Sequence, residues 1–394
     1  MLPEVRMARV IDAIGLHRRR RLSCEEAGEL LGLSERHFRR LRDAYEARGA
    51  AGLVDHRRGR ASGRRVPADE VAWVVEEFRT RYFDFTAKHF HEAVAGRLMA
   101  NGRPFSRGYT WTKSVLQLRG LVTKAPKRSA HRKKRQRRPL AGMMLFQDGS
   151  RHAWLPAGPE LDLVVTLDDA TSAVTSIFLT AEEGTASSLR GLHETIAANG
   201  LFSSLYTDRG SHYFLTPKAG AAVDKDRLTQ VGRALAQLGI EHIPSYSPEG
   251  RGRMERLFGT LQMRLPPLIR LAGLTSIAAA NRWLAEVYRH EHNARFAVAP
   301  AEEGAAFVPF VGDLANILCL QEERVVGHDN TVRYQGLVLQ IPEQRHRRHF
   351  VKAKVRVHQY PDGSLALFHG PRRLAGYTLN GTLVDQAGQT QCAA

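Results

Sequence analysis

Three acidic residues stand where their side chains could act together on a phosphate group. Asp148 and Asp208 each close a short apolar run, and Glu255 lies on a helix expected after Pro248 and two glycines. Clustered carboxylates repel one another unless a cation lies between them, and hard oxygen ligands suit Mg²⁺ or Mn²⁺. Two such ions could activate an attacking oxygen and stabilise a leaving one in phosphodiester displacement. Taken singly, each acid is equally consistent with a turn, a cap or a solvated helix face.

The segments around these acids alternate between strand and helix patterns. Apolar runs of strand length are separated by stretches with helical spacing, and Gly200 ends one of the helices. The order strand, strand, strand, helix, strand, helix, strand, helix predicts an α/β domain with a mixed sheet. The expected strands are 143–148, 161–167, 173–179, 203–208 and 241–243, and the expected helices are 185–199, 226–238 and the one carrying Glu255.

Charge is unevenly distributed along the 394 residues. Residues 1–140 contain 33 Lys and Arg against 15 Asp and Glu, which accounts for the whole formal net charge of +18. Residues 324–377 are basic again, with 10 basic and 3 acidic residues, whereas residues 141–323 hold 15 and 21. Basic modules gain affinity for nucleic acids by releasing counterions from phosphates. The pattern indicates basic ends that bind a polyanion around an acidic middle with another task, although solubility alone is an open alternative.

The first basic module has the pattern of a helix-turn-helix. A helix is expected over residues 4–17, and Ser23 with Glu26 forms a capping box for a second helix, in which Leu30 and Leu31 should face inward. Gly32 ends that helix and Ser34 opens a third. On the third helix Phe38, Leu41 and Tyr45 share one face, and arginines that could reach phosphates and guanine edges occupy the others. Gly28 departs from the usual motif, which favours alanine there, and an amphipathic hairpin with a solvated arginine face is the alternative.

Residues 66–123 predict a second helical unit of similar shape. Its third helix has Ser106 as a candidate cap, with Tyr109, Trp111 and Lys113 placed to face DNA, although the aromatic residues could equally form the core. Residues 124–139 follow with nine Lys and Arg and no acid. Such a run is expected to remain a solvated linker that crosses a DNA backbone rather than to pack.

The last third of the chain changes from helix to strand texture. Residues 276–296 predict one helix whose residues Trp283, Leu284, Val287 and Tyr288 pack on the core. From about residue 322, five or so short strands separated by turn signals predict a small SH3-like barrel, whose basic charge favours DNA contact. We expect the tail after residue 380 to be disordered.

Composition excludes several classes of protein. Hydrophobic residues make up 43% of the chain, enough for real cores, but no uncharged apolar window is long enough for a membrane span. The N-terminus lacks the apolar core and cleavage site of a signal peptide. The cysteines Cys24, Cys319 and Cys392 show no metal-ligand spacing. We therefore expect a cytoplasmic, nucleoid-associated protein.

Four motifs around the acids resemble the integrase-type DDE core of bacterial insertion-sequence transposases and, more distantly, retroviral integrases. The motifs are Phe146-Gln147-Asp148-Gly149-Ser150, Leu167-Asp168-Asp169-Ala170-Thr171, Tyr206-Thr207-Asp208-Arg209-Gly210, and Ser247-Pro248 followed by Gly252-Arg253-Met254-Glu255-Arg256. The flanking helical units and the basic β module are similar to those of ISNCY-type transposases, and the segment from Asn293 to Pro300 resembles the stretch that closes many such cores. The resemblance covers nearly the whole chain.

The resemblance implies an RNase H-like fold in which Asp148, Asp208 and Glu255 hold two Mg²⁺ ions, with Mn²⁺ able to substitute. It excludes Asp168 and Asp169 from the metal site because they are turn residues. It also excludes Glu249, because the matching acid stands seven residues after Pro248. The 47 positions between Asp208 and Glu255 exceed the spacing in retroviral integrases and indicate an inserted loop around residues 218–227. His212 could polarise a phosphate or water, although an ordinary loop histidine is the more common case.

The prediction is a multidomain protein with all-α helix-turn-helix modules, an α/β RNase H-like catalytic core and a small all-β SH3-like barrel. The domains are expected at residues 1–65, 66–123, 140–310 and 320–380, with the linker at 124–139. As a transposase it would bind the terminal inverted repeats of its element, cleave their 3′ ends and join them to target DNA as a homo-oligomer, dimer or higher. The residues expected to contact double-stranded DNA are Arg36, Arg39, Arg40, Arg42, Arg57, Arg58, Arg60, Lys113, Lys133, Lys134, Arg135, Arg209, Arg251 and Arg253.

Two other functions stay open at this stage. A DNA-binding regulator or domesticated transposase that no longer cleaves would share all of these motifs, and Arg209, Arg251 and Arg253 could serve in structural ion pairs instead of DNA contacts. A nuclease that acts on RNA–DNA hybrids is disfavoured, because an A-form duplex does not admit a recognition helix into its deep major groove.

Overall fold

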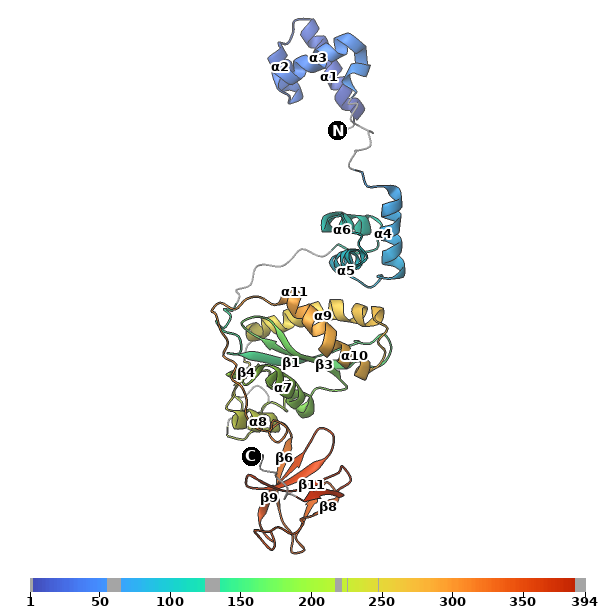
Figure 1. Cartoon of the computed structure of the whole chain (residues 1–394). Helices are drawn as coiled ribbons and strands as arrows, with labels where there is room; N and C mark the ends of the chain where they lie inside the picture. The colour runs from blue at the N-terminus through green and yellow to red at the C-terminus, as the bar shows by residue number, and fades with distance from the viewer. Residues whose placement is uncertain are drawn as a thin grey trace. The chain divides into compact units, whose positions relative to one another are not determined.

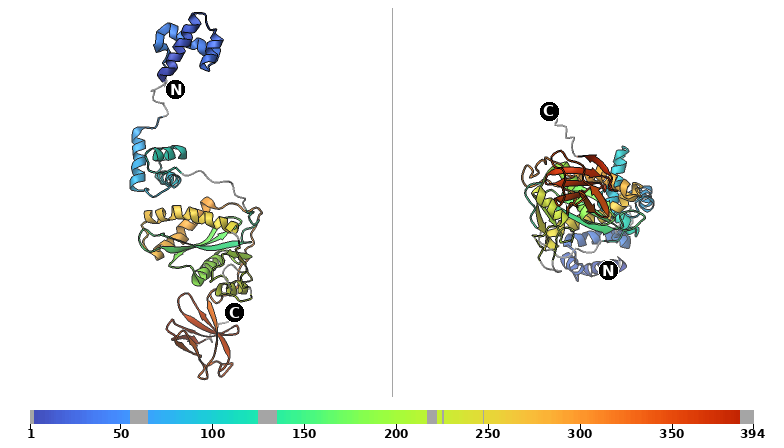
Figure 2. Two further views of the ribbon diagram at one scale, coloured as in Figure 1. Left: turned by 180° about the vertical axis from the view of Figure 1, so that it is seen from behind. Right: turned by 90° about the horizontal axis from the view of Figure 1, so that it is seen from below.

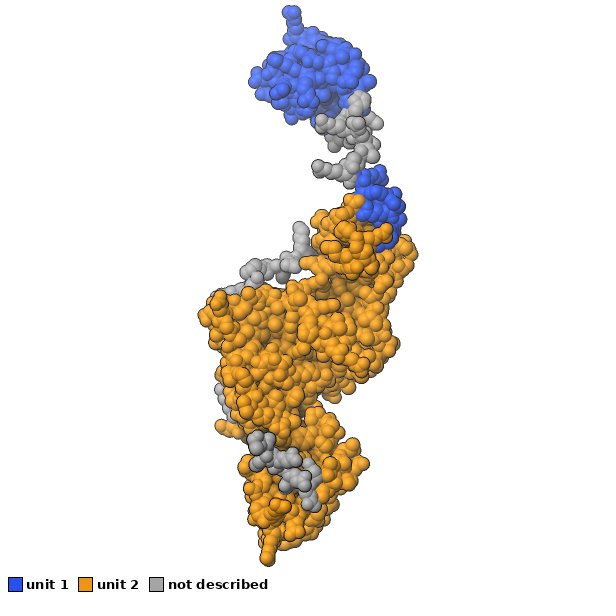
Figure 3. All heavy atoms as spheres, in the orientation of Figure 1, with its two compact units in different colours: residues 1–73 blue, residues 74–394 orange. Residues whose placement is uncertain are grey.

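The computed structural model describes residues 3–54, 65–124, 135–216, 222–224, 226–246 and 248–386. The chain divides into two compact units, residues 1–73 and 74–394, and the division falls inside the helix α4 (Ala68–Thr80) (Figure 3). The finer division into five segments remains a prediction.

The first unit contains the three helices predicted for the first helix-turn-helix module. It comprises α1 (Pro3–Arg18), α2 (Cys24–Leu31), α3 (Glu35–Arg48) and a short 3₁₀ turn (Gly49–Leu53). The capping box is confirmed: the Glu26 amide donates to Ser23 Oγ at 3.1 Å, and the Ser23 amide donates to Glu26 Oε2 at 2.7 Å. Gly32 adopts a left-handed conformation with φ of 66°, as a helix end requires, and Ser34 caps α3.

The core of this unit explains one departure from the expected motif and corrects one prediction. Ile14, Ala27 and Phe38 are fully buried, with Leu31 packed beside them. A β-carbon on Gly28 would lie 2.9 Å from the carbonyl oxygen of Leu33, so glycine lets α2 approach the turn before α3. The inward orientation predicted for Leu30 is wrong, because Ala27 and Leu31 share the buried face at i and i+4 and Leu30 is rotated away, 52% exposed.

The next three helices pack around aromatic residues. They are α4, α5 (Ala87–Ala100) and α6 (Tyr109–Leu118), and Phe78 meets Phe90 edge-to-face with ring centroids 5.2 Å apart. Thr86 caps α5, but the predicted cap Ser106 is wrong. The helix α6 begins after Gly108, so the Ser106 hydroxyl lies too early in the chain to reach its first free amides.

A five-stranded mixed sheet forms the centre of the second unit. Its strands are β1 (Leu145–His152), β2 (Leu161–Asp168), β3 (Val174–Thr180), β4 (Ser204–Thr207) and β5 (Glu241–Pro244), in the order β3-β2-β1-β4-β5. β1, β2 and β3 are antiparallel neighbours, and β1, β4 and β5 are parallel ones. This sheet order is that of an RNase H-like fold, and the predicted alternation of strands and helices is confirmed.

Helices cover both faces of this sheet (Figures 1 and 2). One face buries Phe146, Leu163 and Val165 against α9 (Pro248–Leu271) and the helical segments that follow it. The other face buries Leu145 and Leu205 against α7 (Thr185–Asn199) and α8 (Gln230–Leu238). Successive strand residues therefore point to opposite helix layers, as the pleat requires.

Two predicted element boundaries around the acids are wrong. β1 does not end at Asp148 but continues to His152, because residues 149–152 keep pairing with β2. α9 begins at Pro248, a favoured first position since proline has no amide hydrogen to leave unpaired, so the two glycines lie inside the helix. Gly250 is needed there, since a β-carbon would lie 2.1 Å from the hydroxyl oxygen of Tyr206.

Asparagine side chains close the outer edge of β3. Asn281 on α10 (Ile277–Trp283) accepts from the Leu179 amide at 2.6 Å and donates to the Leu179 carbonyl at 2.9 Å. Asn293 on α11 (Arg289–Phe296) makes the same pair of bonds with Val174, at 2.8 and 2.9 Å. The free amides and carbonyls of an edge strand can pair with strands of other molecules, so these asparagine side chains protect the edge of β3 from such association.

A π-helical turn (Leu284–Tyr288) joins α10 to α11, where one regular helix was predicted. Leu284 and Tyr288 are buried as expected and Trp283 packs at the margin of the core. Val287 is 39% exposed, so its predicted core position is wrong, because the buried face passes through Leu284 and Tyr288 one turn apart.

The C-terminal part is all-β, as predicted. β6 (Leu320–Val325), β9 (Lys354–Gln359), β10 (Leu365–His369), β11 (Arg372–Tyr377) and β12 (Leu383–Gln386) form a sheet in the order β12-β11-β10-β9-β6, and β7 (Thr331–Tyr334) pairs with β8 (Leu337–Gln340). Closure into an SH3-like barrel remains a prediction. The expected disorder after residue 380 is wrong as far as residue 386, because β12 pairs with β11.

No helix within the described ranges is long and apolar enough to cross a membrane.

Candidate active site

Asp148 and Asp208 come together where two parallel strands part. β1 pairs with β4 only through Leu145 and Phe146, so the side of β1 beyond Phe146 has no neighbouring strand there. Asp148 lies two residues further on, pointing to the same helix layer as Phe146. β4 ends at Thr207, and the carboxylate of Asp208 accepts a hydrogen bond from the amide of Gly210, two residues further along the chain, at 2.9 Å.

One guanidinium group joins the two aspartates. Arg251, on the first turn of α9, donates from Nη2 to Asp148 Oδ2, and its Nη1 lies 3.8 Å from Asp208 Oδ2. Glu255 follows one helical turn later and is exposed. Asp208, Arg251 and Glu255 line an open pocket of about 730 Å³, together with Arg209, Gly210, Ser245 and Tyr246.

The three predicted acids therefore meet in pairs. Asp148 and Asp208 share Arg251, and Asp208 and Glu255 share the pocket. Among the residues that the structure describes, no group of three or more His, Cys, Asp or Glu side chains is gathered closely enough to hold a metal ion. Negatively charged carboxylates repel one another, so they do not come closer together without a positive charge between them. The donor set nevertheless fits a divalent cation by its chemistry, since two carboxylates already share one positive group.

Burial of Asp148 has an electrostatic consequence. Its residue is 8% exposed, and burial raises the pKa of its carboxyl to about 6 although Arg251 opposes that rise. The nearby carboxylates Glu183 and Asp208 raise the pKa further, Glu183 more than Asp208. A buried acid with a strongly raised pKa, paired with an arginine that lines a pocket, marks a candidate functional position.

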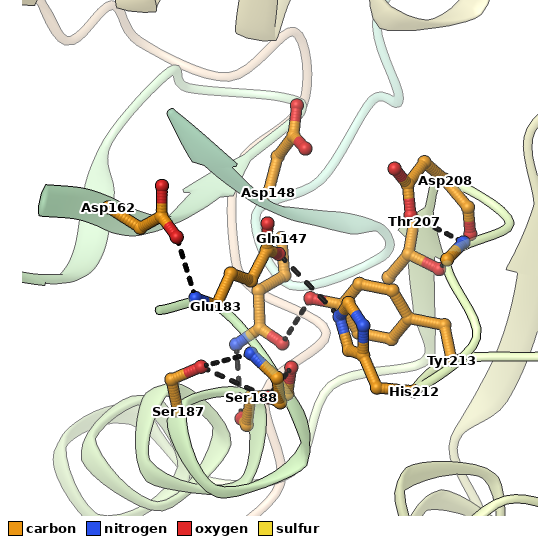
Figure 4. Close-up of polar contacts among 12 residues, drawn as sticks. Gln147, Asp148, Asp162, Glu183, Ser187, Ser188, Thr207, Asp208, His212 and Tyr213 are labelled. Atoms are coloured by element: carbon orange, nitrogen blue, oxygen red, sulfur yellow. Dashed lines mark hydrogen bonds and ion pairs between the residues drawn. The ribbon is translucent and has the colours of Figure 1, made fainter. Parts of the chain in front are cut away.

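A buried hydrogen-bond network lies under the two aspartates, as Figure 4 shows. Gln147, next to Asp148, accepts from the Tyr213 hydroxyl at 3.1 Å and donates to Thr166 Oγ1 at 3.1 Å and the Ser188 carbonyl at 3.3 Å. Tyr213 belongs to the loop that begins with Asp208, so Gln147 ties that loop to β1. Sequence reasoning did not predict this role, and the polar residue within an apolar run was the one available signal.

The excluded acids Asp168 and Asp169 are saturated by structural contacts. Asp168 accepts from the amides of Gly142 and Thr171, both at 2.8 Å, and from the Thr171 hydroxyl at 2.7 Å. Asp169 is fully buried and pairs with Arg135 and Arg253. These contacts agree with their interpretation as turn residues.

The end of the basic linker packs, which corrects the expectation that it would not. The Arg138 amide donates to Asp169 Oδ2 at 2.8 Å, and Arg137 Nη1 donates to the carbonyl of Asp169 at 2.9 Å and to Ser172 Oγ at 2.8 Å. The carbonyl and carboxylate groups at this turn supply the counter-charge that the linker itself lacks.

The predicted DNA contacts differ in what they touch. Arg36, Arg39, Arg40 and Lys113 are exposed on α3 and α6, although Arg39 pairs with Glu35. Arg42 is half-buried and pairs with Asp43. Arg135, Arg251 and Arg253 pair with carboxylates, and the guanidinium of Arg209 lies over the Tyr246 ring at 5.0 Å. The remaining ones, Arg57, Arg58, Arg60, Lys133 and Lys134, lie outside the described residues.

Comparisons with known proteins agree with these features. Residues 12–72 match a family model described as a winged helix-turn-helix. The chain is 30% identical over 363 residues to y4bF of Sinorhizobium fredii, a predicted transposase, covering 91% of this chain and 76% of that protein. It is 28% identical over 235 residues to the transposase for insertion sequence IS1202 of Streptococcus pneumoniae, covering 59% and 50% of the two chains.

Two solved structures resemble the chain with low TM-scores. The HTLV-2 integrase catalytic core domain in complex with magnesium has a TM-score of 0.28 at 17% identity, covering 36% of this chain and 86% of that one. The simian T-cell lymphotropic virus intasome in complex with a PP2A regulatory subunit has a TM-score of 0.32 at 16% identity, covering 78% and 100%. The fold assignment rests on the sheet order of this structure.

A β3-β2-β1-β4-β5 sheet between two helix layers, in a chain that also carries a helix-turn-helix module, defines a DNA-binding protein class with an RNase H-like core. Similarity to y4bF along nearly the whole chain narrows that class. The chain belongs to the family of bacterial insertion-sequence transposases.

Proposed function

We propose that this transposase binds the terminal inverted repeats of its element, cleaves their 3′ ends and transfers the freed 3′-hydroxyls into target DNA. The observation that carries the proposal is the bridging of Asp148 and Asp208 by one cationic group at the parting of β1 and β4. Two carboxylates from separate strands that already share a positive charge suit a site for divalent cations.

The metal ligands in this proposal are Asp148, Asp208 and Glu255, with two Mg²⁺ as the natural ions and Mn²⁺ as a substitute. When bound, the ions activate the attacking oxygen and stabilise the leaving one. Arg251 would then be released from the aspartates and, with Arg209, could hold a DNA phosphate at the pocket. The network from Gln147 to Tyr213 keeps the two aspartate-bearing segments at a fixed separation.

DNA binding is assigned to the helical modules and the basic β module. Exposed arginines on α3 and the winged helix-turn-helix match over residues 12–72 support recognition of the repeats. Because two element ends must be paired for transfer, we propose a homo-oligomer, dimer or higher, with double-stranded repeat and target DNA as partners.

A second candidate is a DNA-binding regulator that no longer cleaves. One observation favours it: within the described ranges, the three acids are not gathered into a single cluster. The two functions differ in whether DNA strands are joined.

A strand-transfer assay separates them. Labelled terminal-repeat DNA from the flanks of the gene is incubated with wild type and Asp208→Asn in Mg²⁺ and in Mn²⁺. Joined products from wild type alone would establish the enzyme and its acids together. Tight repeat binding without cleavage by either protein would favour the regulator.

A further inference from the structure

A second pocket borders α9 on a different face from the active-site pocket. Its volume is about 190 Å³, and the end of the basic linker, the β2–β3 turn and α9 all contribute to it. We call it the linker pocket. Its polar lining consists of Arg137, Ser172, Arg253, Arg256 and Thr260. The residues of α9 in this set are three or four positions apart and so share one helix face, whereas Arg251 and Glu255 face the active-site pocket.

Positive charge at the linker pocket exceeds the negative charge beside it. Three guanidinium groups line the pocket, those of Arg137, Arg253 and Arg256. In the described part of the chain, Asp169 is the one carboxylate that pairs with any of them, and it also pairs with Arg135. Burial lowers the pKa of Arg253 more than Asp169 raises it, and the nearby charges of Arg135 and Arg137 lower it further. The three groups therefore share too little counter-charge.

Two of these guanidinium groups are held in place and the third is not. Arg137 Nη1 donates to Ser172 Oγ at 2.8 Å, and Arg253 Nη2 donates to the Arg135 carbonyl at 2.7 Å. Arg256 is exposed, and no carboxylate within the described ranges pairs with it. The pocket thus combines two fixed cationic groups with one whose donors are available to a ligand.

The exposed face of α9 beside Arg256 carries no side chains at two positions. Gly252 and Gly259 stand one helical turn before and after Arg256, and among the described residues a β-carbon on either would lie in open space. Packing therefore does not require these glycines, although glycine weakens a helix interior. At about 100° per residue, both lie between Glu255 and Arg256 around the helix. A polymer backbone can approach α9 closely along this bare face.

We propose that the linker pocket binds a phosphate of the DNA backbone at a point separate from the active site. This inference rests on the proposed function, because it takes duplex DNA to be the substrate. A guanidinium group presents paired N–H donors to two phosphate oxygens, and the Ser172 hydroxyl, which accepts from Arg137, still has a proton to donate. DNA is favoured over a free phosphate ion, because the bare face of α9 joins this pocket to the one that contains Glu255.

The first test measures binding of the full-length protein to terminal-repeat duplex at several salt concentrations. The variant is Arg256→Gln, and Arg282→Gln is the matched control, since Arg282 is an exposed arginine of α10 outside the pocket lining. We expect R256Q to lower the affinity by about 10-fold. It should also reduce the slope of log association constant against log salt by about 0.9, the value for one phosphate contact. R282Q should match wild type, and both variants should keep the wild-type unfolding midpoint.

The second test identifies the source of the phosphate. Ethylation of single backbone phosphates should interfere with binding by wild type and R282Q at a position where R256Q is indifferent. Inorganic phosphate, followed by thermal unfolding, tests the free ion. If R256Q loses a stabilisation by inorganic phosphate but keeps the wild-type salt slope on DNA, the pocket holds a free anion and the inference is overturned. Equal slopes and equal interference patterns in all three proteins also overturn it.

The two proposals fail in different ways. Wild-type protein that shows the slope difference from R256Q but joins no strands contradicts the proposed chemistry and supports the linker pocket. Wild-type protein that joins strands, with R256Q and R282Q equal in slope and interference, contradicts only the present inference. Wild-type protein that does not bind the duplex overturns both.

Discussion

Two groups of acids in the same sheet have opposite surroundings. Asp168 and Asp169, in the β2–β3 turn, are saturated by backbone amides, a threonine hydroxyl and arginines. Asp148 and Asp208 share a single guanidinium, and Asp208 and Glu255 border an open pocket. Both groups carry paired charge, so ion pairing alone does not distinguish them. The number of donors does, because Asp168 and Asp169 each accept three hydrogen bonds from protein groups, which leaves little capacity for a ligand.

The largest expected effect is the loss of strand transfer when one of the acids Asp148, Asp208 and Glu255 is changed. Asp208→Asn keeps the size of the side chain but removes its charge, and we expect strand transfer to fall by about 1,000-fold or more because transition-state charge loses its support. Repeat binding should stay unchanged in a mobility-shift assay. Glu255→Gln should behave alike, and strand transfer that survives in either variant would contradict the assignment of the acids.

The next effect is a loss of folding stability when Asp169, one of the two acids in structural contacts, is changed. Asp169→Asn leaves Arg135 and Arg253 without their fully buried counter-charge, and we expect the free energy of unfolding to fall by about 3 kcal/mol. Denaturant unfolding of the variant beside Asp208→Asn measures this. A lower free energy of unfolding in D208N than in D169N would contradict the contrast between the two groups of acids.

The ionised carboxylate of Asp148 should lower the stability of the folded protein at neutral pH. Because burial raises its folded-state pKa from 3.8 to about 6, its neutral form favours folding; that contribution is present below about pH 4 and is lost as the pH rises through about 6. The difference between the two pKa values corresponds to about 3 kcal/mol, and it already includes the opposing effect of Arg251. We therefore expect Asp148→Asn to unfold at a higher temperature than wild type at pH 8 and at nearly the same temperature at pH 4. A variant less stable than wild type at pH 8 would contradict this reasoning.

The smallest effect is expected at Thr171. Thr171→Val removes the hydroxyl that donates to Asp168 while Asp168 keeps two amide donors, so we expect a loss of about 1 kcal/mol in unfolding free energy. Strand transfer should remain at the wild-type level. A large loss of activity in T171V would mean that the turn takes part in the chemistry.

Local signals allowed much of the fold to be predicted. Caps such as Ser23 and Ser34 act within one helical turn, and the position of Asp208 follows from the end of a short apolar strand. Two of the failures, Ser106 and Leu30, are also local. The helix α6 begins after Gly108 rather than after Ser106, and Ala27 and Leu31 occupy the buried face of α2.

The surroundings of the site depend on contacts between distant segments, which no local pattern encodes. Arg251 reaches Asp148 across 103 positions, because α9 starts earlier than its glycines suggested. Glu183 reaches β1 only because Gly149 lacks a side chain. Both contacts depend on how far β1 runs past its pairing with β4, which is a property of the assembled sheet.

The π-helical turn has a consequence for insertions and deletions in this family. Asn281 and Asn293 stand twelve residues apart, which at about 100° per residue would place them about 120° apart on a regular helix. The wider turn absorbs one residue without advancing the rotation, so both amides reach β3. Removing the exposed Ala285 would therefore leave an ordinary helix with both asparagines still on one face. We therefore expect this segment to tolerate the loss of one residue while both asparagines keep their hydrogen bonds to the edge of β3.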